Sequence, residues 1–221
     1  MGDRKTGFAK LSGEPARRMD YYELLGIFAE GDGLAGNAFI ESAAFDHDAA
    51  NGTTFDRCVF RGCTFDHADF RDSTLRDVRF EDCRFINATF DKAWLNRVDL
   101  IGCSAPGLSL MQARLASVFV HDCDLSYANL SETSIDWFQL RGTRLREAAL
   151  QRAKLKNVQL TDCDLTRIDV FGTPLRGVDF TTCVFQVPVL SADYHELRGA
   201  VVSPEQAVDL ARLLGVTVSE E

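Results

Sequence analysis

A five-residue spacing of apolar side chains runs through most of this chain. Every fifth residue from Ile40 to Leu190 is apolar, and among these positions only Ala50 and Ala105 are small. The residue two places earlier is usually small, and these positions include all seven cysteines of the sequence. Apolar residues make up 46% of the chain, so composition alone does not produce so regular a series.

Neither an α-helix nor a straight strand accommodates a period of five. Every fifth residue of an α-helix lies about 140° from the last, and every fifth residue of a strand changes face. If positions i−2 and i point inward and i−1 points outward, then i+1 and i+2 both lie outside. The chain must therefore turn a corner every five residues and wind around a filled core.

A longer period of 20 residues gives the number of corners in one coil. The small position carries a valine column and a cysteine column, which are Val78, Val98, Val118, Phe138, Val158, Val178 and Cys63, Cys83, Cys103, Cys123, Thr143, Cys163, Cys183. Like residues at 20-residue steps indicate four pentapeptides per coil. We expect an all-β quadrilateral β-helix with about 7.5 coils, roughly 36 Å long at the usual strand spacing. One expected core ladder is Phe60, Phe80, Leu100, Leu140, Leu160 and Phe180.

The cysteines follow the structural repeat rather than the spacing of a disulfide framework or a metal site. Free cysteine is among the most buried residue types, so we interpret them as small core residues. The oversized Phe138 and the segments 46–54 and 104–108 strain the pattern without shifting it. We expect no metal and no cofactor.

The repeat divides the chain into three parts. Residues 1–36 are predicted to be an N-terminal extension or cap, 37–192 the pentapeptide-based β-helix, and 193–221 a C-terminal strand and helix that form a cap and dimerisation module. Residues 14–30 fit an amphipathic helix that uses Tyr21, Leu24, Leu25 and Phe28. This helix either caps the first coil, which we favour, or binds a partner.

The C-terminal segment has clear helix signals. Ser203 is the expected N-cap, Pro204 takes the first helical position, Gln206 completes a capping box, and Gly215 ends the helix. An apolar stripe on this helix either covers the last coil or pairs with a second copy. The predicted dimer interface is Val201, Val202, Ala207, Leu210, Ala211 and Leu214.

The sequence offers little catalytic chemistry. The four histidines occupy outward or tail positions, and no HExxH, paired CxxC, GxGxxG or P-loop motif is present. Asp122, Asp124, Asp162 and Asp164 suggest a metal ladder or glycosidase carboxylates. Carboxylates at repeat positions are more often solvated turn residues, so we do not expect an enzyme.

Charge and hydropathy restrict the partners. A net charge of −9 argues against direct nucleic-acid binding and is compatible with a basic protein partner. Residues 1–10 lack the apolar segment of a signal peptide, and no stretch of 18 apolar residues is present. We expect a cytoplasmic protein that does not enter a membrane.

The segments CTFDHADF (63–70), CDLSYANL (123–130) and AALQRAKL (148–155) resemble the A(D/N)LxX pattern of the pentapeptide-repeat family, a resemblance that extends over residues 40–190. The tail, with Gln206, Ala207, Ala211 and Gly215, is similar to that of the MfpA type. The resemblance to the Qnr, MfpA, AlbG and McbG types implies a dimeric right-handed β-helix. It further implies a DNA mimic that binds DNA gyrase or topoisomerase IV, and either modulates the enzyme or protects it from poisons.

DNA mimicry requires carboxylates to gather on one face. The expected partner-binding acids are Asp82, Asp122, Asp124, Glu132, Asp136, Asp162 and Asp164. The register runs from 40 to 190 without an insertion, so the chain is closer to the loopless MfpA type than to the loop-bearing Qnr type. The alternative is a non-catalytic scaffold with another protein partner.

Overall fold

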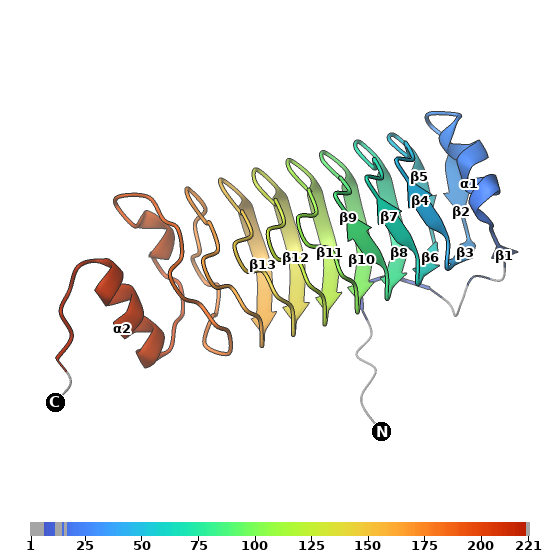
Figure 1. Cartoon of the computed structure of the whole chain (residues 1–221). Helices are drawn as coiled ribbons and strands as arrows, with labels where there is room; N and C mark the ends of the chain where they lie inside the picture. Colours follow the sequence, from blue (N-terminus) through green and yellow to red (C-terminus); the bar gives the residue numbers. More distant parts are fainter. Residues whose placement is uncertain (1–6, 12–14, 16, 220–221) are drawn as a thin grey trace, which may run out of the picture.

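The protein is a rod-shaped parallel β-solenoid (Figure 1). A computed structural model describes residues 7–11, 15 and 17–219. Its helices and 3₁₀ turn are α1 (Tyr21–Phe28), η1 (His195–Leu197) and α2 (Pro204–Leu213). Its strands are β1 (Arg17–Arg18), β2 (Leu34–Gly36), β3 (Ala38–Glu41), β4 (Ala44–Asp46), β5 (Thr54–Asp56), β6 (Val59–Arg61), β7 (Thr64–Asp66), β8 (Thr74–Glu81), β9 (Arg84–Ile86), β10 (Trp94–Ile101), β11 (Arg114–His121), β12 (Ser134–Arg141) and β13 (Lys154–Thr161).

Strand pairing confirms the 20-residue coil. Leu95 of β10 lies beside Leu75 on one side and Leu115 on the other, in parallel register. The longest sheet runs β1-β3-β6-β8-β10-β11-β12-β13, and a second sheet runs β4-β7-β9. Isolated bridges such as Asp124↔Arg144 continue the same 20-residue step where no regular strand is assigned.

The corners fall where the broken alternation requires them. The second residue after each apolar position from Ile40 to Leu175 adopts a left-handed conformation, as in Asp77 (φ 54°), Asp82 (φ 52°), Asn87 (φ 50°) and Lys92 (φ 60°). Each coil thus has four sides. We number the sides by the apolar column that each contains, namely side 1 (Phe60 and Phe80), side 2 (Phe65 and Phe85), side 3 (Phe70 and Phe90) and side 4 (Leu75 and Leu95).

The core is a set of stacked side-chain ladders along the rod axis. The rings of Phe70 and Phe90 are 4.6 Å apart at an angle of 4°. Of the predicted ladder, Phe60, Phe80, Leu100, Leu140 and Phe180 are buried, whereas Leu160 is only half-buried. All seven cysteines are free and buried. Phe138 fits at its small position, where it is buried without disturbing the register.

Helix α1 covers the first coils. Leu24 and Phe28 are buried, and the Phe28 ring is 6.1 Å from the rings of both Phe45 and Phe55. Asp48 places a carboxylate at an inward position of the repeat. The Tyr21 hydroxyl of α1 donates a hydrogen bond to this carboxylate. The helix therefore closes an apolar end that water would otherwise reach.

Helix α2 begins with the capping box formed by Ser203 and Gln206. The Gln206 amide also donates to the carbonyl oxygens of Phe180 and Cys183, both at 2.8 Å. A glutamate would complete the capping box but has no N–H to donate. Gln206 thus fastens the helix to the last coil. The strand expected within the C-terminal segment is reduced to one bridge, Asp179↔Val201.

Sides 4 and 1 open into a seam after β13. The backbone N–H groups of Trp94, Arg114 and the other residues that begin the long strands donate to the coil before them, the last being Lys154 N–H to Thr133 O. The next equivalent residue is Pro174, which has no N–H. Within the described chain, residues 174–181 do not pair with β13, and they bond instead to the C-terminal segment, as in Leu175 N–H to Glu196 O.

The seam explains why part of the core is accessible. Leu155, Val158 and Leu160 are half-buried although they occupy inward positions. They line a cavity of about 40 Å³ together with Leu175, Val178 and other core residues. On sides 2 and 3 the backbone stays paired with the next coil, as in the bridges Asp164↔Val184 and Asp169↔Val189. The split is therefore confined to two sides of the rod.

Candidate functional site

The seven predicted partner-binding acids do not share one face. Asp82, Asp122 and Asp162 lie along the corner between sides 1 and 2, at every second coil. The other acids are distributed over the remaining surface, with Asp124 and Asp164 on side 2, Glu132 at the far corner of side 3 and Asp136 on side 4. The solenoid therefore gathers three of the predicted acids into a row and separates the other four.

Three of the separated acids form ion pairs. Arg144 lies 3.0 Å from Asp124, Arg146 lies 2.6 Å from Asp164, and Lys156 lies 3.3 Å from Asp136. Burial raises the pKa of Asp124, but the Ser126 hydrogen bonds and Arg144 outweigh it and hold the pKa below its usual value. These neutralised carboxylates contribute less negative potential than their number suggests.

The corner row, which we define as Asp82, Asp122 and Asp162, owes its geometry to glycine. Gly102 and Gly142 occupy the intervening corner positions with left-handed φ values of 64° and 57°. A Cβ atom at Gly102 would collide with the Asp82 carboxylate, and one at Gly142 would collide with that of Asp122. Among the described residues Asp82 and Asp162 have no ion pair, and the one ionic partner of the Asp122 carboxylate is His121, at 3.5 Å.

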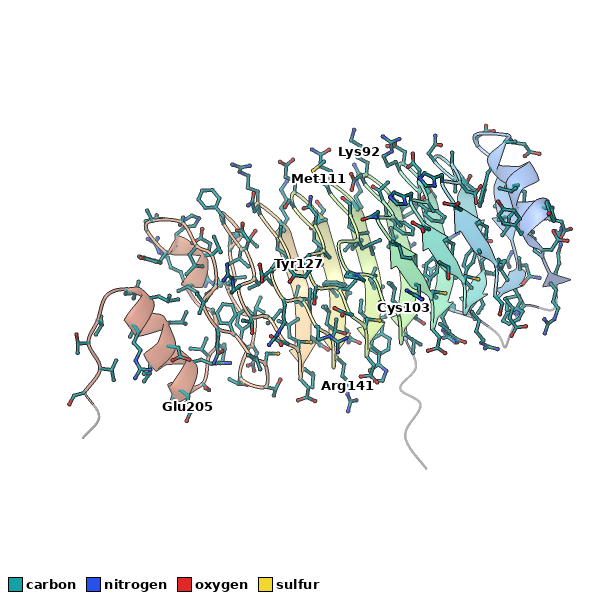
Figure 2. All side chains as sticks on the ribbon, viewed as in Figure 1. Lys92, Cys103, Met111, Tyr127, Arg141 and Glu205 are labelled. Atoms are coloured by element: carbon teal, nitrogen blue, oxygen red, sulfur yellow. The ribbon has the colours of Figure 1, made fainter. Side chains whose placement is uncertain are left out.

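Exposed aromatic side chains form a second surface feature. Trp94, Tyr127 and Trp137 are 43%, 62% and 48% exposed. Aromatic residues with this exposure are enriched where proteins bind other proteins. Figure 2 shows the side chains projecting around the rod, with Met111 and Lys92 on one edge and Arg141 on the opposite edge.

Two buried carboxylates anchor the N-terminal segment, which the sequence analysis did not single out. Asp99 accepts hydrogen bonds from the N–H groups of Phe8 (2.8 Å) and Ala9 (3.2 Å), and Asp77 accepts one from Lys10 N–H (2.9 Å). Arg79 and Arg97 pair with these aspartates. Burial raises the pKa of Asp99. Asp99 occupies an ordinary outward position of the repeat, beside Phe119 of the next coil, so the sequence pattern gives no signal for this contact.

Two clusters of described residues contain histidine beside aspartate. The imidazoles of His47 and His67 stack 4.5 Å apart, and each ring contacts the preceding aspartate at 2.6 Å. Ser191 Oγ and Asp193 both contact Nδ1 of His195, at 3.0 and 2.8 Å. A Ser-His-Asp triad uses different ring nitrogens for the nucleophile and the carboxylate, so this cluster does not activate Ser191. No cluster of three potential metal ligands occurs among the described residues.

The predicted dimer interface is partly exposed. Val201 and Leu214 are 45% and 49% exposed, and Ala207 also faces solvent. Val202 and Leu210 are partly buried against the core, so they also hold the helix to the rod. Neither helix α1 nor α2 has the length and hydropathy needed to cross a membrane, and the same holds throughout the described residues.

Comparison with solved structures returned other solenoids of low sequence identity. Full-length QnrB1, a plasmid-mediated fluoroquinolone resistance protein, is 20% identical, with 90% of this chain and 95% of that chain covered and a TM-score of 0.47. HetL of the cyanobacterium Nostoc sp. strain PCC 7120, a pentapeptide repeat protein involved in heterocyst differentiation regulation, is 18% identical, with coverages of 83% and 92% and a TM-score of 0.44. A search of curated proteins gave no significant match.

Two family models match the repeat itself. The model described as a pentapeptide repeat region matches residues 38–110, and the model for eight copies of the pentapeptide repeat matches residues 93–131 and 128–167. Together they span residues 38–167, more than half of the chain. These matches agree with the five-residue corners and the 20-residue pairing, and the chain belongs to the pentapeptide-repeat proteins.

Proposed function

We propose that this protein acts by binding another protein through its outer surface, and that this partner is a type II topoisomerase, DNA gyrase or topoisomerase IV. The observation that carries the proposal is the corner row. Its three carboxylates lie on one edge of a straight rod, and the described residues place no lysine or arginine in an ion pair with them. An edge of this kind can occupy basic surface that otherwise receives a DNA backbone.

The charge density of the corner row sets a limit on the mimicry. Carboxylates two coils apart are separated by about 9.6 Å, whereas duplex DNA carries one charge per ~1.7 Å of axis. The row alone therefore supplies roughly one sixth of the charge of DNA. We infer that it sets the position of the rod on the enzyme, while other contacts provide most of the affinity.

We also propose that two copies associate through the α2 end. Val201 and Leu214 give this end an exposed apolar surface, and symmetric pairing would align two rods end to end. The corner row would then be present once in each half. A dimer would therefore present twice the length of acidic edge that one copy presents to a topoisomerase.

A supercoiling assay with purified gyrase tests the topoisomerase proposal. We expect the protein to inhibit supercoiling, or to rescue it from a topoisomerase poison, with an effect that weakens as salt is raised. The variant D82N/D122N/D162N should lose most of this effect. The control D32N/D72N/E147Q removes the same number of charges from exposed positions elsewhere. Equal activity of the two triple variants would contradict a role for the corner row.

A scaffold for another protein is the second candidate function. Trp94, Tyr127 and Trp137 favour it, because they lie on sides and corners away from the corner row. If gyrase is unaffected at micromolar protein, the topoisomerase proposal fails. Substitution of these aromatics would then be the next step in locating the partner surface.

A further inference from the structure

A shallow hollow lies on side 4, away from the corner row. It has a volume of about 380 Å³ and spans the coils that begin with Trp94, Arg114, Ser134 and Lys154. Successive coils are about 4.8 Å apart, so the hollow is roughly 14 Å long. It exists because Ser134 and Ala116 are small, while their neighbours in the same two columns carry larger side chains.

The hollow combines an apolar wall with unpaired cations. Trp94 is 43% exposed and lies at one end of the hollow. Lys156 pairs with Asp136 at 3.3 Å, but among the described residues no acid forms an ion pair with Arg114 or Lys154. The lining therefore carries three cations and one anion.

This positive site stands out against the charge of the whole molecule. The chain has a net charge of −9, so an unpaired arginine and an unpaired lysine beside an exposed tryptophan do not follow from a generally basic surface. They attract an anionic group at short range, where local charges dominate over the net charge once salt screens the rest. A long nucleic acid is disfavoured, because its other phosphates would meet the acidic remainder of the rod.

We propose that this side-4 hollow binds an extended acidic peptide segment of a protein partner. An apolar side chain of the segment packs on Trp94, and two carboxylates pair with Arg114 and Lys154. These two cations are two coils apart, about 9.6 Å. This distance matches one three-residue turn of a polyproline II segment, about 9.3 Å, in which residues three apart lie on the same face. The expected pattern is thus an apolar residue followed by two acids three residues apart. The site is separate from the corner row and does not depend on the topoisomerase proposal.

The two tryptophans of the chain allow a direct binding assay. The variant W137F leaves Trp94 as the only tryptophan. It leaves the hollow intact, because Trp137 lies outside its lining. The probe is the peptide acetyl-Phe-Ser-Glu-Ser-Ser-Glu-amide. We expect a saturable change in Trp94 emission that weakens with salt, at least a tenfold loss of affinity in R114E/K154E, and little change in the control R84E/R141E. Both double variants change the net charge by the same amount.

Control peptides and variants separate specific binding from a general charge effect. The same peptide with glutamine in place of glutamate should not bind, and the variant D82N/D122N/D162N should keep its affinity for the acidic peptide. No saturable change in Trp94 emission, or equal losses in R114E/K154E and R84E/R141E, would overturn the proposal. Tighter binding of a thymidine oligonucleotide with matched charge would also overturn it, in favour of a nucleic-acid site.

Discussion

Leu115 and Leu155 occupy the same column of the solenoid, two coils apart, and differ sharply in burial. Leu115 is 2% exposed and pairs with coils on both sides, whereas Leu155 lies at the open seam and is half-buried. Leu→Ala at a buried site costs about 3–4 kcal/mol, from the lost transfer free energy plus the cavity that remains. At Leu155 part of the side chain already contacts water, and solvent can fill the space, so we expect about 1–2 kcal/mol.

Urea denaturation measures this difference in the free energy of unfolding. The two variants should differ by about 2 kcal/mol at an unchanged m-value. Leu95→Ala is the matched control, since Leu95 is buried in the same column and should behave like Leu115. Interactions in a solenoid are between neighbouring coils, so the position along the rod matters only through local contacts. Equal losses at Leu115 and Leu155 would show that the seam is closed in solution and would refute the reasoning.

Four further predictions concern the seam, the core and the C-terminal end. Pro174→Thr restores a backbone donor, so it should stabilise the fold by about 1 kcal/mol in urea denaturation; a loss would mean that the proline is not what opens the seam. Phe80→Asp buries an unpaired carboxylate and should abolish the β-sheet circular dichroism; a folded variant would contradict the inward register. Leu214→Asp should convert the proposed dimer to a monomer in light scattering without unfolding it, because Leu214 is exposed. The hydrogen bond that the His195 ring donates to the Asp193 carboxylate raises the pKa of His195 and lowers the pKa of Asp193. The stabilisation from the imidazolium is therefore complete below 6.5, the ordinary His value, and is lost as pH rises through the raised pKa, whereas the Asp193 contribution is lost as pH falls below 3.8. An NMR titration of His195 should have its midpoint above 6.5, and Asp193→Asn should lower it.

Most of the fold could be predicted because every pentapeptide has the same pattern of inward and outward residues. Inward positions, corner positions and the 20-residue pairing all follow from which residues can be buried and where the strand alternation breaks. The C-terminal helix was predictable for a similar reason, since Ser203, Pro204 and Gln206 act within one turn of chain. Such local signals do not require knowledge of distant contacts.

The candidate site was less predictable because it depends on which side chains from different coils meet. The sequence identifies acids at outward positions, but it does not show that Asp124 and Asp164 have arginine partners 20 and 18 residues away. Nor does it show that none of the described arginines pairs with Asp82. It also gave no reason to connect Trp94 with Lys154, which are 60 residues apart and line one hollow. Pro174 is visible in the sequence as a residue without an N–H. Its effect becomes clear only in the structure, where the equivalent residues of the preceding coils each donate a backbone hydrogen bond to the coil before.

The sequence by itself thus determined a four-sided solenoid with capped ends, because a period of five fixes the direction of each side chain within its own strand. Only the tertiary structure decided which charges are neutralised, where the core opens, and how the N-terminal segment binds Asp77 and Asp99. These features depend on distances between side chains in neighbouring coils and on segments outside the repeat. No periodic pattern encodes such distances, because each one is set by a particular pair of residues brought together by the winding of the chain.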